Sequence, residues 1–266
     1  MVERTTTLRI AVGGALGRMG RAVAEVLAGR ADAKVVAAYD RPEVVGQALG
    51  GLTLEGASAA LAACDVAIDF STPAASVETA KQAAAAVRPA LVIGATGWTG
   101  AQEAEIAAAA RRLAIVKSGN YSLGVNVLAG LVEQAARRLP AADWDIEISE
   151  AHHHRKVDAP SGTALMLGEA AAEGRRVGLG QVRLQAREGI SGPRPPGAIG
   201  FASLRAGGIV GEHTVMFASE EEVLTLSHSA RDRKLFARGA IAAALWVAGQ
   251  PPGLYDMKDV LGFREP

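Results

Sequence analysis

The stretch LRIAVGGALGRMGRAVAEVLAG, residues 8–29, decides the fold class. Its first five residues form an apolar run typical of a buried strand, and residues 18–29 have the apolar spacing of a helix. Glycines at positions 14, 17 and 20 are spaced three apart, from the turn after the strand into the start of the helix. A strand, a glycine-rich turn and a helix in this order favour dinucleotide binding, because small residues let the backbone approach a pyrophosphate at the helix N-terminus.

The loop alone is a weak signal, because Ala15 stands where the GxGxxG pattern has its first glycine. A glycine-rich turn in some other α/β protein is the alternative. Asp40 favours the dinucleotide interpretation, since it ends the next strand and lies 20 residues beyond Gly20, about where such folds place a ribose-binding acid. Arg41 would instead suit a 2′-phosphate, so NADH and NADPH both remain open, and Arg18 adds positive charge for phosphate.

The rest of the first half repeats the same alternation. Apolar runs predict further strands at 35–39, 64–70, 90–96 and 113–118, and a helical pattern follows each of the last three. Ser71 or Thr72 can cap one of these helices, with Pro73 in its first turn. Near-continuous apolar strands between helices imply a parallel sheet that is covered on both faces. The turns after the last two strands, 94–97 and 118–122, should lie where a nicotinamide would bind, although ordinary turn chemistry explains them equally well.

The pattern changes after Pro140. Residues 144–152 alternate apolar and polar side chains, as a half-exposed strand does, and residues 223–230 do the same. A segment rich in glycine and proline separates them, and a helix is expected to start at Ser161. These features predict a second, smaller mixed α/β domain with an open sheet, beside a Rossmann-like parallel domain. The helical pattern at 233–249 should return the chain to the first domain.

Composition narrows the class of protein. The 266 residues carry 28 basic and 28 acidic side chains, so no overall charge attracts nucleic acid. A single cysteine, Cys64, rules out an internal disulfide and a cysteine-based zinc cluster. The N-terminus has no signal-peptide pattern, and the longest apolar stretch near the C-terminus is shorter than the roughly 18–20 residues of a membrane span. We therefore expect a cytoplasmic protein that binds neither nucleic acid nor membrane.

The stretch EAHHHRKVDAPSGTA, residues 150–164, gathers three of the five histidines. A metal site is one interpretation, but consecutive strand residues point to opposite faces, so His152, His153 and His154 cannot converge, and no metal is expected. A solvated polar loop is another. A catalytic site uses every residue, because a helix start can bind a carboxylate while Lys156 and the histidines supply cationic contacts and protons. Such a site suits hydride reduction of a C=N or conjugated C=C bond in a small dicarboxylate.

The same stretch closely resembles the signature of the 4-hydroxy-tetrahydrodipicolinate reductase family, pyridine-nucleotide reductases of the diaminopimelate route to lysine. The resemblance covers nearly the whole chain. Other stretches that carry it are GxxGRMGR from Gly14, DFSTP (69–73), VIGATG (92–97), SGNYSLGVN (118–126), REGISGPRPPGAIGF (187–201), LRAGGIVGEHTVMF (204–217), SHSARDR (227–233) and the tail from Ala244 to Leu261. The histidine signature is highly specific, whereas the glycine loop is not.

The resemblance implies a role for particular residues. His152 would be the proton donor or acceptor and Lys156 the proton donor, while His153, Gly162 and Thr163 would bind the carboxylates of a cyclic substrate. NADH or NADPH would contact Gly14, Ala15, Leu16, Gly17, Arg18, Met19, Asp40, Arg41, Gly94, Ala95, Thr96, Ser118, Gly119, Asn120 and Tyr121. The dinucleotide-binding domain would comprise residues 1–123 and 234–266. Residues 124–233 would bind the substrate and build a homotetramer through their sheet.

Two rival functions remain at this stage. A non-catalytic sensor that only binds NAD(P) would need no acids in its site, yet residues 150–164 are rich in them. A reductase or dehydrogenase for another small carboxylate, such as an amino acid, would keep the same residue types. Turnover of the pathway substrate with NADH distinguishes all three.

Overall fold

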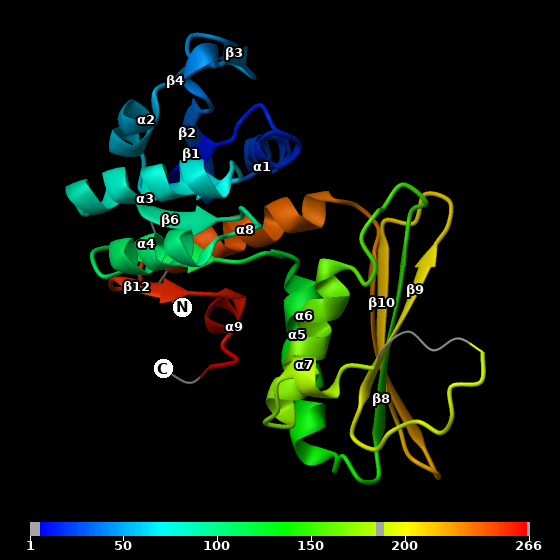
Figure 1. Cartoon of the computed structure of the whole chain (residues 1–266). Coiled ribbons are helices and arrows are strands. Elements are labelled where there is room, and N and C mark those ends of the chain that lie inside the picture. The colour runs from blue at the N-terminus through cyan, green and yellow to red at the C-terminus, as the bar shows by residue number, and fades with distance from the viewer. Residues whose placement is uncertain (1–5, 185–188, 265–266) are drawn as a thin grey trace. The chain divides into compact units, whose positions relative to one another are not determined.

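The computed structural model describes residues 6–184 and 189–264. The chain divides into two compact units, Met1–Leu123 with Lys234–Pro266, and Gly124–Arg233. Arg187 and Glu188, which begin one of the family-like stretches, lie outside the described residues, as do the chain ends 1–5 and 265–266. Each unit has its own sheet and its own apolar core (Figure 1).

The first unit contains an eight-stranded sheet within the described residues. Every neighbouring pair is parallel except the last, which is antiparallel. In sheet order the strands are β12 (Gly253–Tyr255), β7 (Ala114–Lys117), β6 (Ala90–Ile93), β5 (Val66–Asp69), β1 (Leu8–Gly13), β2 (Ala33–Tyr39), β4 (Leu52–Glu55) and β3 (Ala48–Leu49).

Helices cover both faces of this sheet (Figure 1), which explains why its strands are apolar on both sides. Ile10 and Val12 pack in one core and Ala11 in the other. The helices of the first face are α1 (Arg18–Ala28) and α8 (Lys234–Val247), and those of the second are α2 (Ala57–Ala63), α3 (Pro73–Ala86) and α4 (Gly100–Ala110). The Rossmann-like parallel sheet expected from the sequence is confirmed.

Local sequence signals account for where the long helices begin. Thr72 caps α3, with its side-chain oxygen accepting a hydrogen bond of 3.3 Å from the Ala75 amide, and Pro73 occupies the first turn. Ser71 does not serve as the cap. Several short elements were not predicted from the sequence. Elements of so few residues are ordered by packing against the rest of the fold, so they carry no local sequence pattern. Besides α2, β3, β4 and β12, they are η1 (Pro42–Val44), α7 (Leu179–Val182) and α9 (Met257–Val260).

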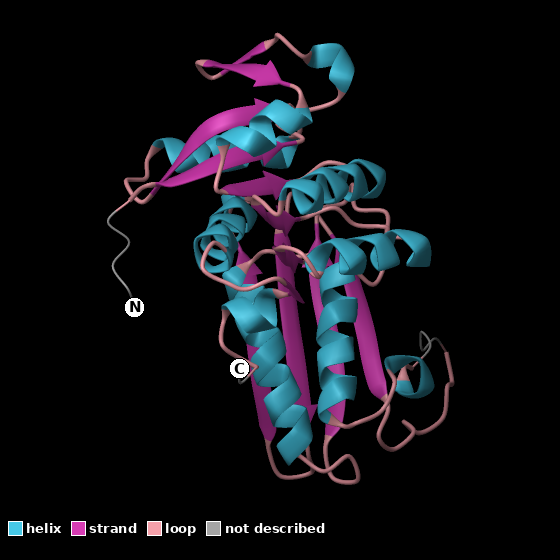
Figure 2. Ribbon diagram, turned by 90° about the vertical axis from the view of Figure 1, so that its left-hand side faces the viewer, coloured by secondary structure: helices cyan, strands magenta, loops and turns pink. Residues whose placement is uncertain are grey.

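The second unit has a mixed four-stranded sheet, as the sequence predicts. Its order is β11 (Val223–Ala230), β10 (Gly211–Ala218), β8 (Asp145–His152) and β9 (Ile199–Arg205), and only β8 and β9 are parallel. Helices α5 (Leu123–Arg138) and α6 (Gly162–Gly174) pack on one face, where Figure 2 shows two long helices lying along the strands. The other face is open, with Met216 39% and Leu204 66% exposed.

The alternation of β8 places functional side chains on its covered face. Ile146 and Ile148 point into the core, and the same side of the strand carries Glu150 and His152 further along. A strand that enters the core with two isoleucines therefore ends there with a carboxylate and an imidazole. These two polar groups must find partners inside the unit, because burying a polar group without a hydrogen bond is costly.

Candidate active site

The glycines between β1 and α1 let the loop pack closely against the start of the helix. Gly14 has a φ of +64°, which favours glycine, and a Cβ on Gly20 would lie 2.4 Å from the Gly14 carbonyl oxygen. Gly17 is the N-cap of α1, and no side chain caps that helix. The first amides of α1 are thus open to an anion such as a pyrophosphate, whose charge the helix dipole also favours.

Asp40 is held beside this loop by backbone amides. One carboxylate oxygen accepts from the Leu16 amide at 2.9 Å, and the other accepts from the Arg41 amide at 2.9 Å. Ala15 donates to the Tyr39 carbonyl at 3.2 Å, which ties the loop to the end of β2. The acid that sequence spacing assigned to a ribose is therefore fixed against the glycine loop, and Arg41 next to it is exposed.

The turns after β6 and β7 contact each other. The Ser118 amide donates to the Ile93 carbonyl at 3.2 Å, and the Tyr121 hydroxyl donates to the same carbonyl at 2.8 Å. A Cβ on Gly119 would lie 3.7 Å from the side chain of Thr96. The Tyr121 ring is only 2% exposed, so its side chain anchors the turn in the core and leaves contact with a ligand to the backbone.

The carboxyl ends of β1, β2, β6 and β7 all lie at one edge of the parallel sheet. The structure brings to this edge the loops that hold every residue expected to bind NADH or NADPH, namely 14–19, 40–41, 94–96 and 118–121. Such an edge, next to the strand where the order of the sheet reverses, is where open α/β sheets bind nucleotides. The glycine cradle and the uncapped helix fit a dinucleotide.

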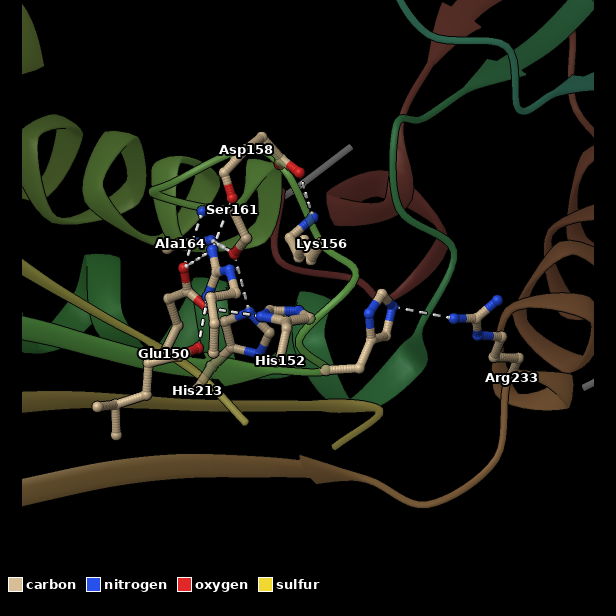
Figure 3. A network of polar contacts seen from close by, with 11 residues as sticks. Glu150, His152, Lys156, Asp158, Ser161, Ala164, His213 and Arg233 are labelled. Carbon is tan, nitrogen blue, oxygen red and sulfur yellow. Dashed lines mark hydrogen bonds and ion pairs between the residues drawn. The ribbon is translucent and has the colours of Figure 1, made fainter. Parts of the chain in front are cut away.

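The histidine signature builds a connected polar network in the second unit (Figure 3). Nδ1 of His152 lies 2.5 Å from one oxygen of Glu150, whose side chain is fully buried. Arg205 of β9 contacts both oxygens of the same carboxylate, at 2.8 and 2.7 Å. Burial opposes ionisation of Glu150, but hydrogen bonds from Arg205 and other neighbours outweigh it and lower the pKa of the carboxyl to about 2.

Lys156 and the start of α6 lie on the loop that follows β8. The Lys156 ammonium is 2.8 Å from a carboxylate oxygen of Asp158, and this contact lowers the pKa of Asp158. Ser161 caps α6, its hydroxyl oxygen accepting from the Ala164 amide at 3.1 Å. Gly162 and Thr163 are the first helical residues, as the sequence predicts. Their backbone amides therefore lie at the N-terminus of α6, the positive end of the helix dipole.

His153 contacts Arg233, whereas His152 contacts Glu150. Its Nε2 lies 3.3 Å from a guanidinium nitrogen of Arg233. Desolvation, together with the charges of Arg155 and Arg233, lowers the pKa of His153. A neutral imidazole beside an arginine can bind a carboxylate by a hydrogen bond, with the arginine supplying the charge.

His213 of β10 completes the network. Its Nε2 is 3.2 Å from the Ser161 hydroxyl, and its ring meets the His152 ring edge-on with centroids 5.1 Å apart. Burial, reinforced by the nearby His152, lowers the pKa of His213 to about 4. His213 is therefore neutral at physiological pH and adds no positive charge beside His152.

This shift has a consequence for stability. Between the usual pKa of 6.5 and the folded value of about 4, the unfolded chain binds a proton at His213 and the folded chain does not. The free energy of unfolding should thus fall as pH drops through this window, by up to about 3 kcal/mol from this residue. His213→Gln, whose amide can still hydrogen-bond to Ser161, should remove that share of the pH dependence in urea unfolding. An unchanged pH dependence would contradict the buried, neutral state of His213.

For several residues of this network, the sequence predicted no functional role. Glu150, Arg205 and His213 come from three strands, and Ser161 was assigned only as a helix cap. The spacing of Glu150 and His152 on one strand face was a usable signal. The pairing of His152 with Arg205 across β8 and β9 was not, because register between distant strands is set by the fold.

Within residues 6–184 and 189–264, no three His, Cys, Asp or Glu side chains are grouped so as to hold a metal ion. None of the described helices combines the length and the apolar character needed to cross a bilayer.

Comparison with known proteins shows which family has this architecture. Residues 8–121 match the family model of the dihydrodipicolinate reductase N-terminus, and residues 124–261 match the model of its C-terminus. The chain belongs to the dihydrodipicolinate reductase family. This confirms the resemblance seen in the histidine signature, and with it the prediction of an NAD(P)H-dependent oxidoreductase of the lysine route.

Individual relatives cover almost the full length. The 4-hydroxy-tetrahydrodipicolinate reductase of Caulobacter vibrioides is 61% identical over 258 residues, which are 97% of this chain and 98% of the relative. That of Rhizobium rhizogenes is 52% identical, over 96% and 97%. A dipicolinate-bound dihydrodipicolinate reductase from Paenisporosarcina sp. TG-14 superposes with a TM-score of 0.78 at 24% identity, covering 94% and 98%, which shows the same fold.

Proposed function

We propose that this chain reduces 4-hydroxy-tetrahydrodipicolinate, or the dihydrodipicolinate formed from it by loss of water, to tetrahydrodipicolinate. The observation that carries the proposal is the meeting of a helix start, a lysine and a carboxylate-paired histidine within residues 150–163. A cyclic dicarboxylate needs two anion-binding groups and a proton beside the reduced carbon. This segment supplies all of them.

Each group has a distinct task in the proposal. The amides of Gly162 and Thr163 bind one carboxylate of the ring, and His153 helps to hold the carboxylates. Lys156 donates the proton that follows hydride addition, and His152 donates or accepts protons at the nitrogen opposite Glu150. The positive end of α6 and the Lys156 ammonium also stabilise negative charge that develops during reduction.

Bound NADH or NADPH supplies the hydride. Residues 14–19 and Asp40 hold its pyrophosphate and ribose, and the turns 94–96 and 118–121 hold the nicotinamide end. Asp40 can accept from the ribose hydroxyls of NADH, whereas the exposed Arg41 suits the extra phosphate of NADPH. We infer that the chain uses both cofactors.

The proposal is tested by turnover. The substrate is made in the assay from pyruvate and aspartate semialdehyde by the preceding synthase, and loss of reduced nicotinamide is followed by absorbance. We expect oxidation of both NADH and NADPH that depends on the synthase. A flat trace despite measurable NADH binding would support a sensor, and turnover of an amino acid instead would support a different dehydrogenase.

Family resemblance also supports a homotetramer in the cytoplasm, free of nucleic acid and membrane. The open face of the β11-β10-β8-β9 sheet, which exposes Met216 and Leu204, is the surface proposed to meet other copies. Light scattering on the eluted protein should give four times the chain mass of 27.3 kDa. A monomer mass would contradict this part of the proposal.

A further inference from the structure

The buried carboxylate of Glu150 connects three segments of the second unit. Its side chain is 0% exposed and its two oxygens take hydrogen bonds from His152, from two nitrogens of Arg205 and, at 3.2 Å, from the Ser161 amide. These donors come from β8, from β9 and from the cap of α6. A carboxylate with so many donors is ionised, so it can only accept hydrogen bonds.

The direction of these bonds fixes the tautomer of His152. Because Glu150 only accepts, the proton of the contact between them belongs to Nδ1 of His152. When the ring is neutral, Nε2 is then the unprotonated nitrogen and is available to take a proton. The Ser161 hydroxyl, which accepts from the Ala164 amide, lies 3.2 Å from Nε2 of His213 and joins that ring to the same network.

Arg205 also contacts the loop that carries Lys156. Besides its two contacts with Glu150, its guanidinium donates to the Asp158 carbonyl at 2.6 Å. The carboxylate of Asp158 in turn pairs with Lys156 at 2.8 Å. One arginine thus links the partner of His152 to the partner of Lys156 (Figure 3 shows both ends of this link).

We propose that Glu150 and Arg205 are positioning residues for the reduction. Glu150 holds His152 as its Nδ1–H tautomer, and Arg205 holds both the Glu150 carboxylate and the loop that carries Lys156 in place. The proposal rests on the proposed roles of His152 and Lys156. Neither Glu150 nor Arg205 touches the substrate in it. Both act before the reaction, by fixing where protons and donors lie.

Glu150→Gln is the first test, because an amide can donate to Nδ1 and thereby favour the wrong tautomer. Loss of a carboxylate partner of a catalytic histidine lowers turnover by up to about 10⁴-fold where it has been measured in serine proteases. Here we expect kcat to fall by about 10²–10³-fold, while KM for the substrate changes by less than about threefold, since the carboxylate-binding groups are retained. Glu169→Gln on α6, whose side chain is exposed and has no role in the proposed site, is the control and should keep its activity.

Arg205→Lys tests the other residue. It keeps one positive charge for Glu150 but loses the paired contact and the link to the Asp158 carbonyl. We expect an intermediate fall in kcat, of about 10–100-fold, with KM again little changed. An effect on KM alone would mean that Arg205 serves substrate binding instead, and would overturn its positioning role.

A third measurement needs no variant of Glu150, in case Glu150→Gln does not fold. Nitrogen NMR of the labelled full-length protein reports the tautomer of each of the five histidines, and His152→Gln identifies the signals of His152. We expect a protonated Nδ1 and an unprotonated Nε2 in the neutral ring. The opposite tautomer, or a Glu150→Gln variant as active as Glu169→Gln, would overturn the positioning proposal alone. Full activity of His152→Gln would instead overturn the proposed role of His152, and this proposal with it.

Discussion

Lys156→Ala is expected to lower turnover by about 10²–10⁴-fold, the usual contribution of a placed proton donor, and to leave NADH affinity unchanged. Lys156 lies on the loop between β8 and α6, in the second unit, whereas the residues that fit a dinucleotide lie in the first. The cofactor should therefore bind as in the unsubstituted chain. Steady-state turnover and a fluorescence titration with NADH measure the two quantities separately.

Two further variants sharpen this test. Lys156→Arg keeps the positive charge but is a far weaker proton donor, so KM should stay near its original value while kcat falls. Lys81→Ala on α3 removes a lysine that forms a half-exposed ion pair with Glu105, and should have no effect. Loss of NADH binding in Lys156→Ala, comparable to its loss of turnover, would show that the lysine has been misassigned.

The second large effect is expected for Gly20→Ala. The added Cβ would lie 2.4 Å from the Gly14 carbonyl oxygen and 2.7 Å from the Ala15 Cα, and backbone atoms cannot rotate away. Overpacking of this kind costs about 1–3 kcal/mol, so displacement of the phosphate loop should weaken NADH binding by roughly 5–100-fold.

Matched glycines make this test specific. Gly29→Ala, at the other end of α1, places its Cβ in open space at a φ of −99° and should bind NADH normally. Gly17→Ala meets only the Gly14 carbonyl oxygen, at 3.1 Å, and should have an intermediate effect. NADH titrations accompanied by thermal unfolding distinguish a displaced loop from a destabilised unit. Normal NADH affinity in Gly20→Ala would argue against a dinucleotide at this loop.

Much of the fold could be predicted from the sequence because its signals are local. The apolar run ending in Gly13, the Thr72-Pro73 helix start and the Ser161 cap each carry their own stereochemical reason, and the structure has all three. The short elements between Pro42 and Ala63 carry none. They are ordered by packing against β2, which no local pattern encodes.

In the candidate site too, the sequence predicted what local patterns encode and missed what the fold brings together. Spacing alone put Asp40 near the glycine loop, and the capping signal put Gly162 at a helix start. The sequence did not reveal that Glu150 would be buried, nor that Arg205, 55 positions further on, would neutralise it. Contacts of this kind depend on strand register, and they decide whether a histidine is merely polar or held in one tautomer.

The most direct test is a crystal structure of the chain with NADH and pyridine-2,6-dicarboxylate, a flat analogue of the substrate. One carboxylate of the analogue should accept hydrogen bonds from the amides of Gly162 and Thr163, with the Lys156 ammonium within hydrogen-bonding distance and Nε2 of His152 facing the ring. A ring bound away from Lys156 and Thr163, while NADH occupies the glycine loop, would contradict the proposed site.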